Sequence, residues 1–455
     1  MKLRKPRALC IVPPVYDFAL YDLFLKPYGL LRIAALLEDL GFEVRMINSL
    51  RYRDPESEKL LPKPKRKKNG TGKFFRQEAR FPINQKKYQI RVERNFARYG
   101  IDQKVFENEV AGTDPDIVFM SSGMTYWYPG IKEAAEIVRR IHPSVPVIIG
   151  GIYAALMEEH CREEIAPDYC ISQFSLPMLQ ELLEGLGLLI KDRPMPDLLP
   201  GPLFSAECWG DAGVLRLNEG CPYRCEYCAS AKITERFIPG DPEKGFEDLR
   251  SLSAMGIRNF AFYDDALLVN KEKILVPFLE KIIRSGIDAD FYVPNAVHIE
   301  MLDFDTAALM RKAGFQEMRL GFESSSLGFH EEYDGKFSPD TFGFTVEVLK
   351  RAGFRGRDIG VYILTGMPGQ TFEAVEESVA FAAGFGVRIF LSEFSPVPGS
   401  SLWEECCRKS RYPLAEEPLY HNNTFFPMEW AGFSLQELKR IKKRVKELNK
   451  QLKES

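Results

Sequence analysis

The chain has 455 residues, roughly two to three times the size of a usual single domain, which excludes a small disulfide-stapled fold. Hydrophobic residues make up 45% and charged residues 27%, which excludes wholesale disorder and collagen-like repetition. With 61 Lys and Arg against 64 Asp and Glu, the net charge of -3 provides no polycationic field for nucleic acid.

No apolar run approaches the roughly 18 to 20 residues that a transmembrane helix needs, so we expect no membrane span. The N-terminal stretch MKLRKPRALCIVPP lacks the long apolar segment and the small-residue cleavage site of a secretory signal. We therefore expect a cytoplasmic protein. In that reducing compartment the nine cysteines are not expected to form a disulfide framework, and a cluster of them indicates metal binding or chemistry.

Apolar, strand-like runs alternate with helical patterns over residues 1–190. The predicted strands are 9–12, 43–47, 116–120 and 147–149, and the predicted helices are 29–37, 131–140 and 154–164. Nearly continuous apolar strands between helices indicate a parallel sheet that is covered on both faces. The pattern predicts an α/β, doubly wound, Rossmann-like domain.

A basic insertion at about 50–112 interrupts this alternation. Its basic side chains are Lys63, Lys65, Arg66, Lys67, Lys68, Lys73, Arg76 and Arg80. A charge run of this kind is typical of a solvated, mobile loop. Two alternatives stay open, namely a lid that orders over a substrate and a contact for an acidic partner protein.

Prolines mark a boundary near 190–205, and a second alternation follows over 205–400. Its predicted strands are 214–217, 259–263, 290–293, 318–322, 359–364 and 389–394, and the helical patterns between them lie near 244–255, 271–285, 304–313, 340–352 and 372–384. This order predicts a partial (β/α)6 barrel with its site at the C-terminal strand ends. Residues 401–455 form a helical C-terminal segment, and its last helix, 435–452, is predicted to pack on the surface rather than to bind a membrane.

Three cysteines follow the first strand of this second domain with a C-x3-C-x2-C spacing, at Cys221, Cys225 and Cys228. Three thiolates so close in sequence can hold three irons of an iron–sulfur cubane and leave the fourth iron open to another ligand. The alternative is a structural zinc site completed by Cys208 or a histidine. Structural zinc usually pairs two separated knuckles, and this sequence offers no second knuckle.

This loop, with Tyr227 directly before its last cysteine, resembles the signature of the radical SAM superfamily, and the resemblance covers about 205–400. It implies that Cys221, Cys225 and Cys228 are the catalytic residues and the ligands of a 4Fe–4S cluster. The open iron would bind S-adenosylmethionine (SAM), which an electron from the cluster cleaves to methionine and a 5'-deoxyadenosyl radical. The resemblance also implies oxygen sensitivity and a low-potential electron donor, flavodoxin or ferredoxin.

Further segments at strand ends resemble parts of the SAM site in the same superfamily. The paired Asp264 and Asp265 end the second strand, where the alternative is a helix N-cap. Glu323 ends the fourth strand in a G-x-E-S segment near the SAM ribose, and its carboxylate can accept hydrogen bonds from both ribose hydroxyls. A glycine turn follows the fifth strand, near adenine, although its glycines can equally serve only the turn. The SAM contacts implied are Tyr227, Asp264, Asp265, Glu323, Ser325 and Gly366.

A doubly wound domain ahead of such a barrel is similar to the cobalamin-dependent radical SAM class. Its cofactor would lie at the C-terminal strand ends, beside the topological switch point. Small residues there would let the backbone approach the dimethylbenzimidazole tail. The cobalamin contacts implied are Ser121, Ser122, Met124, Tyr126, Gly150 and Gly151.

The sequence departs from that class at two places. It lacks the D-x-H-x-x-G segment, so we do not expect a histidine to hold the lower axial position of cobalt. The turn that contains Tyr126 and Trp127 would instead form an apolar floor below the corrin, although core packing explains these aromatics equally well. In addition, residues 172–175 read Ser-Gln-Phe-Ser where the class often has a Gly-Glu pair.

The function favoured by these features is a cobalamin-dependent radical SAM methyltransferase that acts on an unactivated carbon. One alternative is a cobalamin-free radical SAM enzyme that performs carbon–carbon coupling, cyclisation or rearrangement. The other is a non-catalytic metal-binding module, which predicts zinc instead of iron. The sequence does not identify the substrate, and the near-neutral charge only disfavours nucleic acid.

Overall fold

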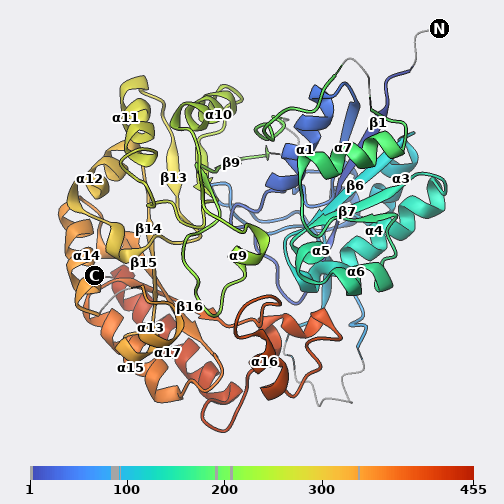
Figure 1. The fold of residues 1–455 in the computed structure, drawn as a ribbon. Helices are drawn as coiled ribbons and strands as arrows, with labels where there is room; N and C mark the ends of the chain where they lie inside the picture. Colours follow the sequence, from blue (N-terminus) through green and yellow to red (C-terminus); the bar gives the residue numbers. More distant parts are fainter. Residues whose placement is uncertain are drawn as a thin grey trace. The chain divides into compact units, whose positions relative to one another are not determined.

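The computed structural model describes residues 4–83, 92, 94–189, 193–204, 209–336 and 339–454. The chain divides into two compact units, Met1–Gly210 and Asp211–Ser455. In the ribbon of Figure 1 the first unit runs from blue to green and the second from green to red. Each unit is an α/β structure with its own parallel strands.

The first unit is built on a five-stranded sheet in which every neighbouring pair of strands is parallel. The strands are β1 (Arg7–Val12), β3 (Glu43–Asn48), β6 (Ile117–Ser122), β7 (Val147–Gly151) and β8 (Tyr169–Cys170). They lie in the order β3-β1-β6-β7-β8, which is the 2-1-3-4-5 order of a doubly wound fold. The predicted fold of this part is confirmed, and its switch point lies between β1 and β6.

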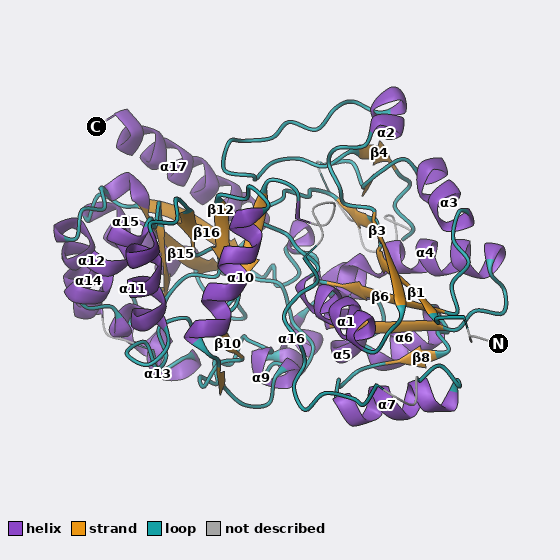
Figure 2. Cartoon of the chain, turned by 90° about the horizontal axis from the view of Figure 1, so that it is seen from above, coloured by secondary structure: helices purple, strands orange, loops and turns teal. Residues whose placement is uncertain are grey.

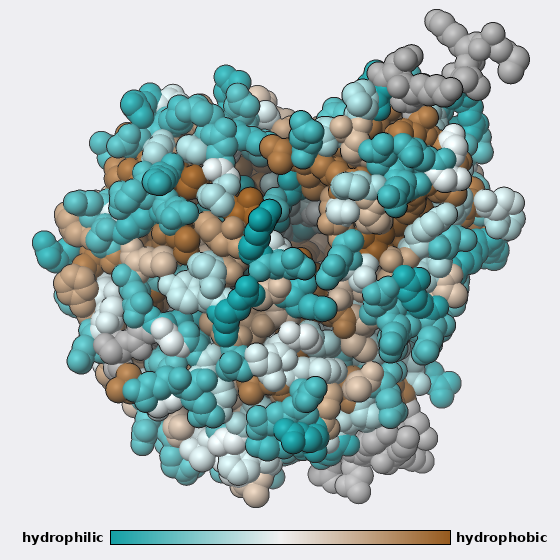
Figure 3. Space-filling view, in the orientation of Figure 1, coloured by the Kyte–Doolittle hydropathy of each residue, from teal (hydrophilic) through white to brown (hydrophobic). Residues whose placement is uncertain are grey.

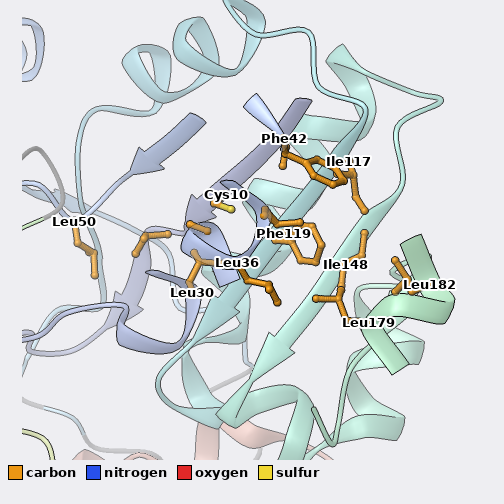
Figure 4. Packing of buried hydrophobic residues seen from close by; sticks show 14 of the residues in the cluster. Cys10, Leu30, Leu36, Phe42, Leu50, Ile117, Phe119, Ile148, Leu179 and Leu182 are labelled. Atoms are coloured by element: carbon orange, nitrogen blue, oxygen red, sulfur yellow. The ribbon is translucent and has the colours of Figure 1, made fainter. Parts of the chain in front are cut away.

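Helices connect and cover these strands. They are α1 (Tyr28–Asp39), α3 (Gln103–Ala111), α4 (Tyr128–Ile141), α5 (Ile152–Leu156), α6 (Glu158–Glu164) and α7 (Leu176–Gly185). Figure 4 shows Cys10, Phe119 and Ile148 from the strands packed with Leu36 of α1 and Leu182 of α7. The single helix predicted at 154–164 is instead α5 and α6, because the backbone leaves the helical region at Met157 (φ -136°).

The described part of the basic insertion is folded and is not a simple solvated loop. It contains α2 (Pro55–Leu60), β4 (Arg76–Glu78) and β5 (Ala97–Tyr99), and these two strands join β2 (Val15–Asp17) in an antiparallel sheet with β5 in the middle. Arg66 pairs with the buried Asp22 at 2.7 Å and lies over the ring of Tyr52 at 3.6 Å. Apolar residues lie among the basic ones in this segment, and Phe75 is fully buried. The charge pattern did not indicate this burial.

The second unit contains two parallel three-stranded sheets, β13-β12-β9 and β14-β15-β16. The strands are β9 (Ala212–Leu215), β12 (Asn259–Phe262), β13 (Asp290–Tyr292), β14 (Met318–Glu323), β15 (Ile359–Thr365) and β16 (Arg388–Glu393). Parallel bridges link Phe291 to Phe315 and Val297 to Leu320, so the six strands follow one another in chain order. Among the described residues no pairing joins β16 to β9, and the predicted partial, open barrel is confirmed.

Helices alternate with these strands and gather along their outer side (Figure 2). They are α10 (Pro242–Ala254), α11 (Leu275–Ser285), α12 (Phe304–Ala313), α14 (Pro339–Arg351) and α15 (Phe372–Gly384), with the shorter α9 (Ser230–Ile233) and α13 (Leu327–Tyr333) at the strand ends. A small hairpin pairs β10 (Asn218–Glu219) with β11 (Ile238–Pro239). It places the cysteine loop directly after β9.

The C-terminal segment packs against the second unit through α16 (Trp403–Lys409) and α17 (Leu435–Glu454). Leu438, Ile441 and Val445 form the buried stripe of α17, as predicted for a packed helix. The side chain of Asn449 accepts a hydrogen bond from the N–H of Ile389 at 2.9 Å and donates one to its C=O at 2.7 Å, which ties α17 to β16. Within the described ranges, none of the helices combines the length and apolar character that crossing a bilayer requires. Hydrophilic side chains cover most of the face seen in Figure 3, with apolar patches between them.

Candidate active site

The cysteine loop begins at a sharp turn that only glycine accommodates well. Gly220 has φ +72°, and a Cβ there would lie 2.8 Å from the backbone oxygen of Arg236. Beyond it Cys221 is half-buried, Cys225 is buried and Cys228 is exposed, and the N–H of Cys228 donates to the C=O of Cys225 at 3.0 Å. All three thiols are free.

The local environment determines how these thiols ionise. Burial raises the pKa of Cys221, and it raises that of Cys225 to about 11, while the ammonium group of Lys336 acts in the opposite direction on both. Among the described residues, no three Cys, His, Asp or Glu side chains converge closely enough to hold a single metal ion. Cys208, the fourth ligand considered for zinc, lies outside the described residues. Three thiols spread around one loop suit the separate irons of a cubane better than one tetrahedral ion.

Asp264 holds the segment that leads into this loop. Its two carboxylate oxygens accept hydrogen bonds from the backbone N–H groups of Leu217 at 3.1 Å and Asn218 at 2.7 Å, and the residue is 2% exposed. Burial raises the pKa of Asp264 to about 7, although the two N–H donors oppose that shift. It is not a helix N-cap, since the cap of α11 is Ile274, and each of its oxygens already accepts one backbone hydrogen bond. The neighbouring Asp265 is exposed, and its charge raises the pKa of Cys221, which places it near the loop.

Glu323 stands at the end of β14 in a strained backbone conformation. Its φ is +60°, and the pairing of β14 with β15 shifts register between Gly321 and Glu323. A non-glycine residue in the left-handed region costs free energy and is most often retained where a site needs it. Burial raises the pKa of the Glu323 carboxyl, and Lys336, whose Nζ lies 3.8 Å from Oε1, opposes that rise.

Ser325 and Gly366 are engaged within the fold. The N–H of Ser325 donates to Oγ of Ser378 on α15 at 3.0 Å, and the two hydroxyls lie 3.2 Å apart. The N–H of Gly366 donates to Oε1 of Gln370 at 2.6 Å, which closes the turn after β15. A Cβ at Gly366 would lie 2.3 Å from the ring of Phe426, so the backbone passes close to that ring.

A polar network joins Tyr227 of the cysteine loop to α13, and the sequence analysis did not single out its other members. The hydroxyl of Tyr227 donates to Oδ2 of Asp334 at 2.9 Å and receives a hydrogen bond from Nζ of Lys336 at 3.0 Å. His330 bridges Oδ1 of Asp334 and the C=O of Ser324, each at 2.9 Å. Only the tertiary fold brings these residues to Tyr227, so no spacing in the sequence indicates them.

His298 is a second residue that the sequence analysis did not single out. Its imidazole stacks on the ring of Tyr223 in the cysteine loop, with ring centroids 4.5 Å apart. Burial lowers the pKa of His298 to about 4, helped by the charge of Lys336. Its buried Nδ1 has no hydrogen-bond partner in the described part of the chain. A neutral imidazole with one free nitrogen therefore lies beside the cysteine loop.

In the first unit, four of the six candidate residues meet at one edge of the sheet. Strand pairing sets Ser121 opposite Gly150 and Ser122 opposite Gly151, at the C-terminal ends of β6 and β7. Gly151 has φ +84°, and a Cβ there would lie 3.0 Å from Cβ of Ser121. The exposed Met124 follows, and its C=O accepts a hydrogen bond from Oγ of Ser122 at 3.1 Å. These residues form an edge of small side chains that suits close approach by a large planar ligand.

The aromatic turn η1 (Thr125–Trp127) divides between the core and the surface. Trp127 is 8% exposed, belongs to the hydrophobic core, and donates its indole N–H to Oδ2 of the buried Asp17 at 2.9 Å. Trp127 therefore serves the core, which is the second of the two roles considered. Tyr126 is half-buried and meets Trp127 edge-on. Ser175 accepts a hydrogen bond from the N–H of Met178 at 3.3 Å, so part of the 172–175 segment is the N-cap of α7.

Comparison with known families identifies two domains in this chain. The family model described as "Radical SAM superfamily" matches residues 215–382, which include the cysteine loop, Asp264, Asp265, Glu323 and Gly366. The model described as "B12 binding domain" matches residues 90–177, which include the small-residue edge of β6 and β7.

Two curated relatives are named as methyltransferases. An uncharacterized methyltransferase of Pyrococcus horikoshii is 25% identical over 360 residues, which are 70% of this chain and 73% of that protein. The cytidylyl-2-hydroxyethylphosphonate methyltransferase of Streptomyces wedmorensis is 25% identical over 224 residues, 46% of this chain and 40% of that protein.

Solved structures share the fold. The radical SAM methyltransferase TsrM of Kitasatospora setae, solved with cobalamin and a [4Fe-4S] cluster, aligns with a TM-score of 0.64 at 15% identity, over 90% of this chain and 76% of that one. The cobalamin-dependent SAM radical enzyme OxsB, solved with aqua-cobalamin and SAM, aligns with a TM-score of 0.53 at 14% identity, over 98% of this chain and 62% of that one. The chain therefore contains a radical SAM domain that follows a B12-binding domain.

Proposed function

We propose that this protein is a cobalamin-dependent radical SAM methyltransferase that methylates an unactivated carbon. The observation that carries the proposal is the presence, in one chain, of a free three-cysteine loop within a radical SAM domain and a small-residue strand edge within a B12-binding domain. The names of the two curated relatives support the methyl transfer.

Cys221, Cys225 and Cys228 would each give a thiolate to one iron of a 4Fe–4S cluster. When bound, the cluster supplies the electron that cleaves SAM to methionine and a 5'-deoxyadenosyl radical, and cobalamin carries the methyl group. Because burial keeps the Cys225 thiol protonated near neutral pH, loading of the loop must release protons. A low-potential flavodoxin or ferredoxin would deliver the electron.

The chain's own residues would bind and orient SAM. Glu323, buried at the end of β14, would accept hydrogen bonds from the ribose hydroxyls. The backbone at Gly366 would face adenine, and Asp265 and Ser325 would meet the polar groups of SAM. Asp264 is not part of this set, because both of its oxygens already hold backbone N–H groups.

The first unit would hold cobalamin at the edge that Ser121, Ser122, Gly150 and Gly151 form. Met124 is exposed and Tyr126 is half-buried in the turn that follows β6, and both would contact the corrin or its tail. In this assignment residues 1–190 bind cobalamin, 205–400 perform the radical chemistry, and 401–455 support the barrel.

The test is to purify the protein without oxygen, supply iron, sulfide and hydroxocobalamin, and measure iron, sulfide and cobalt per chain. We expect about four irons and one cobalamin, followed by formation of 5'-deoxyadenosine from SAM under reduction. The triple variant C221A/C225A/C228A should lose the iron. Cys407→Ala removes a half-buried thiol outside the loop and should keep it.

Each other result would redirect the assignment. Iron without cobalamin would favour the cobalamin-free radical enzyme. Zinc without iron would contradict both enzymatic assignments. If metal and cofactor contents are as expected, isotopically labelled methyl-SAM identifies the methyl acceptor.

A further inference from the structure

Lys336 holds a positive charge in a largely buried place beside the cysteine loop. Its side chain is 14% exposed, its Nζ donates to the Tyr227 hydroxyl at 3.0 Å, and it lies 5.4 Å from the centre of the Tyr227 ring. Tyr227 directly precedes Cys228 in the chain. The side chain of Lys336 therefore contacts the cysteine loop directly, through the side chain of Tyr227.

The lysine is charged at neutral pH. Burial lowers the pKa of Lys336, but the negative charges around it, with the carboxylate of Glu323 first among them and that of Asp334 beside it, raise that pKa above its ordinary value. Burying an ammonium group costs free energy unless anionic groups lie nearby. In this fold those groups are the carboxylates of Glu323 and Asp334.

Hydrogen bonds around Asp334 hold Lys336 next to the cysteine loop. Asp334 accepts hydrogen bonds from the Tyr227 hydroxyl at 2.9 Å and from the N–H of Lys336 at 3.1 Å, and it also bonds His330. The N–H of Glu226 donates to the C=O of Tyr333 at 2.8 Å, a second link between the cysteine loop and α13. These bonds fix the backbone at Lys336 and the hydroxyl of Tyr227, and the ammonium group itself is held by that hydroxyl at 3.0 Å and by Oε1 of Glu323 at 3.8 Å.

We infer that Lys336 is a positioning residue that fixes a positive charge beside the cluster held by Cys221, Cys225 and Cys228 and so raises the reduction potential of that cluster. This inference rests on the proposed function, because it requires the cluster. Reduction adds one electron to a group that already carries thiolates, and a fixed cation stabilises the reduced state more than the oxidised state. Net charge and hydrogen bonding are the means by which a protein sets such a potential.

The experiment compares reconstituted wild-type protein with Lys336→Met and Lys336→Arg, without SAM, by redox titration followed with electron paramagnetic resonance. Lys336→Met should lower the ratio of reduced to oxidised cluster at a fixed potential about tenfold, equivalent to ~59 mV for one electron. Lys336→Arg keeps the charge and should restore the wild-type potential. Lys271→Met is the matched control, since that side chain is 15% exposed and pairs with Asp303, and it should leave the potential unchanged.

Iron analysis separates this inference from the proposed function. A wild-type protein that takes no cluster overturns both. An unchanged potential in Lys336→Met, or an equal fall in Lys336→Arg, overturns only the inference. If Lys336→Met takes no cluster, Lys336→Gln provides the second variant, because it removes the charge but keeps a polar side chain. A lower potential in Lys336→Gln supports the inference, and a wild-type potential contradicts it.

Discussion

The ring of Tyr223 stacks on the imidazole of His298, with centroids 4.5 Å apart and planes 15° from parallel. This contact buries a titratable group beside the cysteine loop. Burial lowers the pKa of His298 to about 4, whereas a histidine in the unfolded chain titrates near 6.5. Protonation of the imidazole is therefore less favourable in the folded protein than in the unfolded chain.

His298 should make the apoprotein sensitive to mild acid. Because the folded-state pKa lies below the unfolded one, its contribution to stability is complete above about pH 6.5 and is lost as pH falls towards 4. His298→Phe keeps a flat ring and removes the titration. Between pH 7 and pH 5, the free energy of unfolding of the wild type should fall by about 1–2 kcal/mol more than that of the variant. Urea unfolding at the two pH values measures the difference, and equal falls would contradict the assignment.

Asp264 should be required for assembly of the cysteine loop. Asp264→Asn leaves one acceptor oxygen for two backbone donors and turns an NH2 group towards the other N–H. We expect a loss of about 1–3 kcal/mol of stability, because a buried donor is left without a partner. Thermal unfolding of the apoprotein and iron content after reconstitution measure the two effects.

Asp265→Asn is the matched control, since the adjacent carboxylate is exposed. It should keep both the wild-type unfolding temperature and the iron. Equal iron loss in the two variants would show that Asp264 has no special part in holding the loop.

Alanine substitutions at Gly150 and Gly151 should have different effects, one on the stability of the fold and the other on cobalamin binding. Gly151→Ala places a side chain at φ +84° and 3.0 Å from Ser121, and should destabilise the protein by about 1 kcal/mol or more. Gly150→Ala meets no atom closer than 3.8 Å and should fold normally. In the folded Gly150→Ala protein, the added methyl group should weaken cobalamin binding, measured by equilibrium dialysis. Wild-type affinity in that variant would argue against this edge as the cobalamin site.

The architecture was predictable because strand and helix periodicities are local properties. The parallel strands around Cys10 and Phe119 and those of the barrel read as apolar runs, and their order follows from the handedness of the connections. The small sheet of the insertion was not predictable. Its strands β4 and β5 have three residues each and gain stability only by pairing with the distant β2.

The site was predictable where the chemistry lies within one short segment. The cysteine spacing and the carboxylate at Glu323 are of this kind. Lys336 and His298 reach the loop only through the tertiary fold, so nothing in their sequence neighbourhood sets them apart. Asp264 also lies at the expected strand end, but the sequence did not indicate that its carboxylate accepts two backbone N–H groups.

Glu323 should lower the stability of the fold through its backbone conformation and should contribute to SAM binding through its carboxylate. Its φ of +60° favours glycine, and a side chain in the left-handed region costs roughly 1–2 kcal/mol. Glu323→Gly and Glu323→Ala both remove the buried carboxylate and differ only in this backbone cost. The glycine variant should therefore be about 1 kcal/mol more stable than the alanine variant, measured by chemical unfolding of the apoproteins. Both should bind SAM more weakly than the wild type after reconstitution. If the alanine variant equals the glycine variant in stability, the strain is absent, and if either binds SAM normally, Glu323 does not contact SAM.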